Sequence, residues 1–299
     1  MAFLVAAISF MLGALAGGGT GSSKSALEED SAPAGPLAEL PRGGRTLMPD
    51  YRLVAFYGAP QDEELGVLGV GEPEQAVRGL IRQARAYRRP SRPVLPAAEL
   101  IATIASADPG ADSKYRFRQP DPVISRYLRE ARRRRALLIL DVQPGRADFI
   151  DEVKALGNFL RHPDVGLALD PEWHVGPDQV PGQVIGSVDA EAVNEVSEYL
   201  AGVVRRHGLP EKILVVHQFT PDMITRRGRL EDRAEVAIVL NSDGFGDRAN
   251  KVAKYRELRP SRGSPLHRGF KLFYEEDEGL MSPEVVLDLN PPPDLVIYE

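Results

Sequence analysis

The sequence predicts an α/β fold made of a single (β/α)8 barrel of the TIM type. Three observations lead to it: eight short apolar runs recur after residue 50, helical patterns fill most gaps between them, and the region spans about 250 residues, a usual size for such a barrel. Each run is continuously apolar, as expected for a strand that is buried on both faces. The runs are 53–58 (LVAFYG), 92–100 (RPVLPAAEL), 136–141 (ALLILD), 165–170 (VGLALD), 212–218 (KILVVHQ), 236–243 (VAIVLNSD), 270–276 (FKLFYEE) and 294–299 (DLVIYE).

Amphipathic helices are predicted between these runs. Apolar residues recur every three or four positions in the segments 77–87, 124–131, 149–160 and 193–204. Start signals occur where a capping side chain precedes a proline at the first helical position. These signals are Asp121-Pro122, Thr220-Pro221 and Ser282-Pro283, and His207-Gly208 supplies a stop signal.

Two features depart from a regular barrel. The eighth run is the last segment of the sequence, so we expect the last helix to be missing or replaced by the segment before residue 50. Pro96 interrupts the second run, which predicts a strand that is short or irregular there. The alternative fold is an open, doubly wound α/β sheet, although no G-x-G-x-x-G fingerprint follows the first run to favour it.

The N-terminal region predicts export. Residues 3–16 form an apolar run of signal-peptide length that ends in the A-x-A pattern Ala14-Leu15-Ala16. Because no Lys or Arg precedes this run, residues 1–16 are read as a signal peptide or, alternatively, as an uncleaved N-terminal anchor. Residues 17–49 are rich in Gly, Ser, Ala and Pro and predict a flexible tether, and 50–299 form the barrel domain. We therefore expect a secreted or cell-envelope-associated protein that touches a membrane only through an uncleaved N-terminal segment.

The amino-acid composition excludes several kinds of site and partner. The 299 residues include no Cys, which excludes disulfides, thiol catalysis and Cys-based zinc sites. The formal net charge of -6 argues against a nucleic-acid partner. With one strand-end His, a tight zinc site is not expected and no cofactor is assigned, although a carboxylate-rich site for a hard cation stays open. P-loop, H-E-x-x-H and G-x-S-x-G motifs are absent from the sequence.

Polar residues gather where the predicted strands end, which is the active-site face of such a barrel. The candidate catalytic residues are Glu172, Asp170 and Asp141, and the candidate substrate-binding residues are Tyr57, Glu99, Trp173, His217, Gln218, Asp243, Lys271 and Tyr274. Packing alone does not require so many ionisable groups at the end of a barrel where the strands terminate, which we call the mouth. We therefore predict a binding or catalytic site there for a glycan or another small polar ligand.

The sharpest local feature is the pair Asp170 and Glu172. Residues two apart in a strand point the same way, and two close carboxylates raise one pKa, which keeps a general acid protonated. Trp173 beside them either stacks on a sugar ring or is buried under a loop. Asp141 either contacts a ligand or water, or caps the helix that begins near Asp148.

Two further residues have competing interpretations. His217 is an acid/base group, a metal ligand or a buried structural histidine. Asp243 opens a glycine-containing loop that either approaches a ligand or forms a simple turn.

Four blocks of the sequence resemble a family of secreted, TIM-barrel-like proteins from actinobacteria. The blocks are LLILDVQPGRADF, VGLALDPEWHVGPDQVPGQVIGSV, VVHQFTPDMIT and GFKLFYEEDEGLMSP, and the similarity spans about residues 50–299. This resemblance implies export but no particular reaction. A weaker resemblance, carried only by Asp170 and Glu172, is to glycoside hydrolases with TIM-like barrels, especially muramidase-type lysozymes, whose other strand-end motifs the chain does not reproduce.

Three functions follow from these observations. The first is a secreted glycoside hydrolase with Glu172 as general acid and Asp170 or Asp141 as base, nucleophile or electrostatic stabiliser. The second is a non-catalytic envelope protein that binds a saccharide or peptide at the mouth. The third is metal-assisted ester or phosphoester hydrolysis, which would recruit Asp141, Asp170, Glu172, His217 and Asp243.

Overall fold

Eight parallel strands close into a barrel in the computed structural model, which describes residues 37–261 and 263–299. The strands follow one another round the barrel, and the first pairs with both the second and the last. In this order they are β1 (Arg52–Gly58), β2 (Val94–Ala105), β4 (Leu137–Val142), β5 (Val165–Leu169), β7 (Lys212–Gln218), β9 (Val236–Ser242), β10 (His267–Leu272) and β11 (Leu295–Tyr298). The predicted barrel is confirmed and the open-sheet alternative is wrong. The predicted signal peptide or anchor, 1–16, lies outside the described residues.

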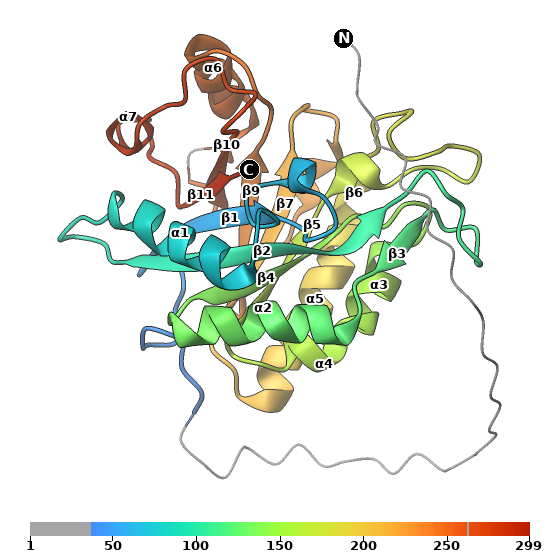
Figure 1. Cartoon of the computed structure of the whole chain (residues 1–299), viewed down its shortest axis with the longest axis horizontal. Coiled ribbons are helices and arrows are strands. Elements are labelled where there is room, and N and C mark those ends of the chain that lie inside the picture. Colours follow the sequence, from blue (N-terminus) through green and yellow to red (C-terminus); the bar gives the residue numbers. More distant parts are fainter. Residues whose placement is uncertain (1–36, 262) are drawn as a thin grey trace.

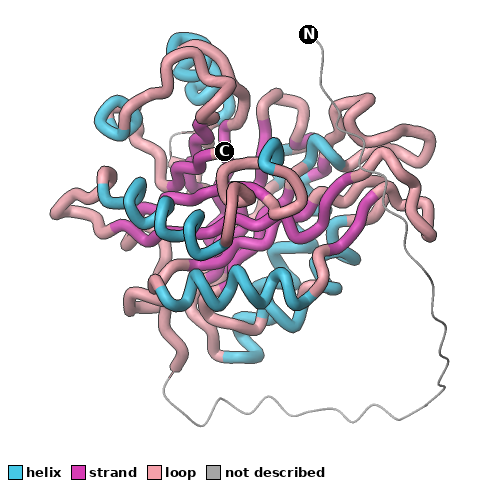
Figure 2. The backbone as a smooth tube through the Cα atoms, viewed as in Figure 1, coloured by secondary structure: helices cyan, strands magenta, loops and turns pink. Residues whose placement is uncertain are grey.

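Helices surround the barrel, with the strands at the centre of the molecule (Figures 1 and 2). They are α1 (Pro73–Arg85), α2 (Asp121–Arg133), α3 (Phe149–Ala155), α4 (Gly157–Leu160), α5 (Ala190–His207), α6 (Arg248–Leu258) and α7 (Pro283–Leu287), with short 3-10 turns η1 (Glu63–Leu65), η2 (Pro171–Trp173) and η3 (Arg227–Arg229). The predicted apolar stripes face the strands, as Val77 and Val193 illustrate by complete burial. Gly208 ends α5 in the left-handed conformation, as its position after His207 predicts.

Two predicted helix starts differ in the structure. Asp121 is the first residue of α2 rather than its cap, which is Pro120. No helix begins at Thr220-Pro221, because the next residues form β8 (Ile224–Thr225), which pairs with β6 (Val188–Asp189). Pairing with a distant segment therefore overrides the local cap signal. The third start is confirmed, since Ser282 accepts a hydrogen bond from the backbone N–H of Val285.

The prediction of a short second strand is also wrong. β2 is 12 residues long and runs through Pro96. Its register with β4 begins only at Ala97, so the missing N–H of Pro96 lies ahead of that ladder. The irregularity falls instead between Ile101 and Thr103, beyond which β3 (Arg116–Arg118) adds an antiparallel strand outside the barrel.

The N-terminal end of the barrel is covered by residues 37–49, the described part of the segment predicted as a tether. Leu40, Leu47 and Met48 are buried against the apolar barrel interior. The carboxylate of Glu211 accepts hydrogen bonds from the backbone N–H groups of Leu47 and Met48. This segment is therefore packed, and the polar mouth lies at the opposite end of the barrel. No helix within 37–261 and 263–299 has the length and apolar character needed to cross a membrane.

Candidate functional site

The C-terminal end of the barrel holds a cluster of polar side chains, which we call the mouth cluster. Alternate residues of each strand face the barrel interior, where Ala55, Ala97 and Val215 belong to the inner apolar core. The next inward position along each of these strands is polar, and register places Tyr57 beside Glu99 and His217 beside Asn241. The mouth cluster comprises Tyr57, Glu99, Asp141, Asp170, Glu172, His217, Asp243, Lys271 and Glu299.

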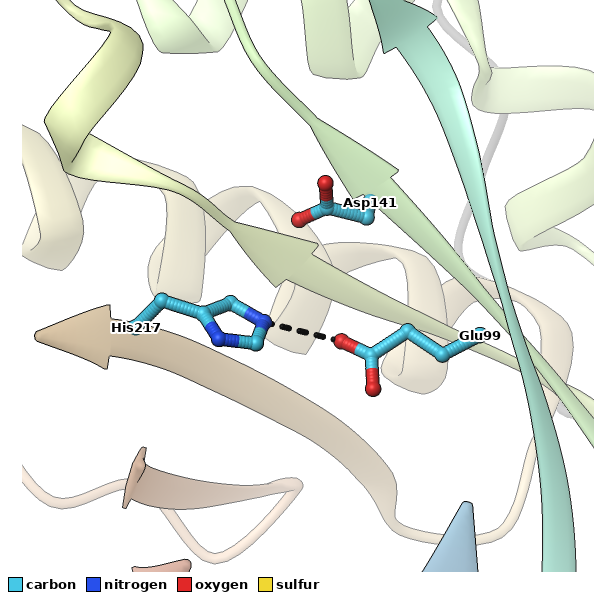
Figure 3. Close-up of side chains that lie close together, drawn as sticks. All are labelled: Glu99, Asp141 and His217. Carbon is cyan, nitrogen blue, oxygen red and sulfur yellow. Dashed lines mark hydrogen bonds and ion pairs between the residues drawn. The ribbon is translucent and has the colours of Figure 1, made fainter. Parts of the chain in front are cut away.

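His217 joins two carboxylates within the barrel. Its Nδ1 lies 2.8 Å from Oδ2 of Asp243. Its Nε2 lies 2.9 Å from Oε1 of Glu99, the contact drawn as a dashed line in Figure 3. Burial by itself lowers the pKa of His217, but Asp243 and Glu99 outweigh it and raise the pKa well above its ordinary value. Burial raises the pKa of Asp243, but the positive charges of His217 and Lys271 outweigh it and lower that pKa. In the absence of another cation, His217 is therefore an imidazolium held between two carboxylates.

Lys271 is the second cation of the mouth cluster. Its Nζ lies 2.5 Å from Oε2 of Glu299, 3.7 Å from Oδ2 of Asp243 and 3.7 Å from the centre of the Tyr57 ring. Burial lowers the pKa of Lys271, but the surrounding acids outweigh it and raise the pKa above its ordinary value. Lys271 therefore stays charged and neutralises the side of the mouth formed by β9, β10 and β11.

Tyr57 links Asp141 and Asp170, which form no ion pair with any of the described residues. Its hydroxyl lies 3.3 Å from Oδ2 of Asp141 and 3.4 Å from Oδ2 of Asp170, and it accepts a hydrogen bond from Gln143. One hydroxyl proton serves only one of the two carboxyl groups at a time. Burial raises the pKa of Asp141 and of Asp170, and the charge of Asp170 raises that of Asp141 further.

Two carboxylate oxygens of the cluster are buried without a hydrogen-bond partner among the described residues. They are Oε2 of Glu99 and Oδ1 of Asp141, and both side chains are fully buried. A buried acceptor left in this state costs about 1–3 kcal/mol, and more when it is charged. Among the described residues, no cation or hydrogen-bond donor therefore compensates these two oxygens of Glu99 and Asp141.

Glu172 differs from the deeper acids because it lies half-buried in η2, at the outer edge of the cluster. Within the described part of the chain, its carboxyl group has no hydrogen-bond partner. Burial raises the pKa of Glu172 well above its ordinary value, and the negative charge of Asp170 raises it further. Glu172 therefore holds a proton closer to neutral pH than an ordinary glutamate does, as a general acid requires.

Two residues expected at the mouth lie elsewhere. Gln218 follows the inward His217 and so faces outward, where its side chain donates to the carbonyl oxygen of Leu258. Tyr274 stacks on Tyr298 on the outer side of the barrel, with 5.2 Å between ring centres. We therefore remove Gln218 and Tyr274 from the candidate site.

Trp173 and Asp141 each had two competing interpretations. Trp173 is half-buried in η2, next in sequence to Glu172. Asp141 belongs to the mouth cluster, and it is Asp148 that stands at the cap position of α3.

Three polar residues outside the list of candidates complete the site. Glu299 binds Lys271, Gln143 binds Tyr57, and the side-chain amide of Asn241 donates to Asp243. Two of these residues can be found from the alternation of side chains along a strand. Glu299 stands two residues after the inward Ile297, and Gln143 stands two residues after Asp141.

Comparison with known proteins leaves the function open. No protein-family model matches the chain, and no curated protein matches it, so the resemblances to a secreted actinobacterial family and to glycoside hydrolases stay predictions. Among solved structures, one similar chain is the Clostridial cellulose synthase subunit Z from Clostridioides difficile. The TM-score is 0.45 with 8% sequence identity, and the match covers 83% of this chain and 91% of that chain. A likeness at this level carries no argument about activity.

The raised pKa of Glu172 predicts a specific dependence of stability on pH. The folded state binds the Glu172 proton more tightly than the unfolded chain, so the resulting stabilisation is complete below the ordinary pKa of 4.5 and is lost as pH rises through the raised value. Relative to Glu172→Gln, the free energy of unfolding of the unmodified protein should therefore fall from about pH 4.5 towards neutrality, by at most about 1.4 kcal/mol per pH unit. Urea unfolding at several pH values measures this difference, and parallel pH curves for the two proteins would contradict it.

Proposed function

We propose that the protein is a secreted or cell-envelope-associated glycoside hydrolase that uses carboxyl groups at the barrel mouth. The observation that carries this proposal is the pair of Glu172 and Asp170. Glu172 is half-buried, its carboxyl group has no hydrogen-bond partner among the described residues, and its pKa is raised well above the ordinary range. Asp170 lies deeper, at the end of β5, where the hydroxyl of Tyr57 and two cations act on it.

The surroundings of these two carboxyl groups give them different pKa values, which suit different roles. Burial raises both pKa values, and at Asp170 the positive charges of His217 and Lys271 oppose part of this rise, so the pKa of Asp170 is raised whereas that of Glu172 is raised well above its ordinary range. Glu172 therefore holds the proton of the pair more tightly than Asp170 does. Two neighbouring carboxyl groups with separated pKa values are the arrangement that glycoside hydrolysis needs.

In the proposed reaction, Glu172 gives its proton to the glycosidic oxygen as the bond to the anomeric carbon breaks. Asp170 faces the developing positive charge on the sugar and acts as nucleophile, as base for the attacking water, or as electrostatic stabiliser. Lys271 and His217 hold Asp243 ionised, so the acids of the mouth keep distinct charge states. A glycan of the cell envelope or of the surroundings fits the predicted export.

A direct test is to incubate the purified full chain with oligosaccharides from envelope and extracellular glycans. Products are followed by chromatography with mass spectrometry, and binding by calorimetry. Catalytic turnover of a glycan supports the proposal. Saturable binding without any product overturns it in favour of a saccharide-binding protein, and turnover confined to ester or phosphoester substrates with added metal overturns it in favour of metal-assisted hydrolysis.

A further inference from the structure

We propose that Glu99, Asp141 and His217 bind one divalent first-row transition cation, such as Zn²⁺ or Mn²⁺, at the floor of the mouth. We call these three residues the cation triad. This inference goes beyond the proposed function, because proton transfer to the substrate is assigned to Glu172 and Asp170.

The geometry of the triad follows from barrel closure. The three side chains come from β2, β4 and β7, and one ligand atom of each lies within 4.8 Å of the others (Figure 3). Bonds from Zn²⁺ to nitrogen and oxygen are about 2.0–2.2 Å, so three ligands of one ion all lie within about 3.8 Å of one another. Side-chain shifts of up to about 1 Å therefore bring all three atoms into coordination distance.

The unpartnered oxygens are a second observation that points to a ligand. Oε2 of Glu99 and Oδ1 of Asp141 are buried and have no hydrogen-bond donor among the described residues. Native proteins satisfy nearly all buried polar atoms, and an unmatched carboxylate oxygen calls for a cation or an equivalent donor. These two are the carboxylate oxygens among the buried, unpartnered side-chain atoms of the described residues, and both belong to the triad, so a single bound ion would satisfy the two carboxylates together.

The surroundings of His217 resemble those of a metal-binding histidine. Such a histidine donates the N–H of its other ring nitrogen to a carboxylate, which sets the tautomer and the orientation of the ring. Here Nδ1 of His217 lies 2.8 Å from Asp243, and Asp243 is in turn held by the side-chain amide of Asn241. This leaves Nε2 on the side of Glu99, where a cation would take the place of the Nε2 proton and release it to solvent.

The donor set selects the class of ion. One imidazole nitrogen with two carboxylates suits Zn²⁺, Mn²⁺ and Fe²⁺, whereas Ca²⁺ prefers oxygen ligands only. We therefore expect Zn²⁺ or Mn²⁺ to bind and Ca²⁺ to bind more weakly.

The test uses the full chain after treatment with a chelator and dialysis. Calorimetric titration with ZnCl2, MnCl2 and CaCl2, together with elemental analysis, is expected to show one Zn²⁺ or Mn²⁺ ion per chain. Asp243→Asn leaves the ligands in place and should weaken binding by about 10–100-fold, the usual effect of an outer-shell partner. Glu99→Gln and Asp141→Asn remove a ligand with little change in shape and should weaken binding more than that.

The matched control is Glu299→Gln, which removes an acid of the same mouth that is not a ligand. It should weaken binding less than Asp243→Asn does, whereas equal losses in all variants would overturn the proposal in favour of a generally acidic surface. Absence of a bound ion from the unmodified chain also overturns it. If the ligand variants do not fold, a titration of the unmodified chain by electron paramagnetic resonance decides, because loss of the free Mn²⁺ signal must stop at one equivalent. These readouts use no substrate, so they are independent of whether the chain cleaves a glycan.

Discussion

Replacing Glu172 with Gln is expected to lower kcat on a cleaved glycan by roughly 10²–10⁴-fold, the usual contribution of a general acid. The amide keeps the shape of the side chain but has no acidic proton to give to the leaving oxygen. Binding of the glycan should persist, because the deeper acids and cations of the mouth are unchanged. Steady-state kinetics with a calorimetric binding measurement separates the two effects.

The pH profile of the same variant gives an independent check. In the proposed reaction Glu172 acts in its protonated form, so the kcat of the unmodified protein should fall as pH rises through the raised pKa of Glu172. Glu172→Gln should lose this falling limb. Glu276→Gln is the matched control, since Glu276 is exposed and lies outside the mouth cluster. Unchanged kcat in Glu172→Gln would remove Glu172 from the mechanism.

The largest expected effect on stability comes from the buried ion pair between Lys251 and Asp277. Their charged atoms are 2.8 Å apart, and the side chains are 2% and 1% exposed. Asp277→Ala would leave the ammonium group of Lys251 buried without a carboxylate, next to the carbonyl oxygens of Gly244 and Lys271 and the rings of Phe270 and Phe273. Breaking a buried pair in this way costs about 3–5 kcal/mol, which urea unfolding at pH 7 measures.

Two variants make this stability test specific. Glu74→Ala removes the acid of an exposed pair with Arg78 and should change the free energy of unfolding by no more than about 1 kcal/mol. The double variant Lys251→Met/Asp277→Leu removes both charges and should recover part of the loss, since the backbone N–H groups of Phe273 and Gly246 still lose the carboxylate that accepts from them. A small effect of Asp277→Ala would show that water or another group compensates Lys251. Because Lys251 also binds Gly244 and Lys271, the pair holds the segments that carry Asp243 and Lys271 to the mouth.

Much of the fold is readable from local sequence. A strand buried on both faces needs a continuous apolar run, and all eight such runs are barrel strands. The same property hides which residues face inward, because both faces of each strand are apolar. Gln218 and Tyr274 were therefore assigned to the mouth from proximity to strand ends, although the structure places both outside it. Glu299 was missed for the same reason. Its inward position becomes clear only once Ile297, two residues before it, is known to face the barrel interior.

Sequence alone determined the barrel class and the polar strand ends, because each depends on residues that are close in the chain. The pairing of Asp170 with Glu172 was predicted from strand alternation, but β5 ends at Leu169 and Glu172 lies in the turn η2, so their arrangement depends on that turn. Barrel closure decided the rest. Glu99, Asp141 and His217 are separated by many residues, and only the ring of strands brings their ligand atoms together. Likewise, composition predicts a tether at 17–49, but in its described part, 37–49, burial of Leu47 beneath the barrel depends on a surface that exists only after the strands have closed. Local chemistry specifies elements, whereas contacts between distant segments specify the site.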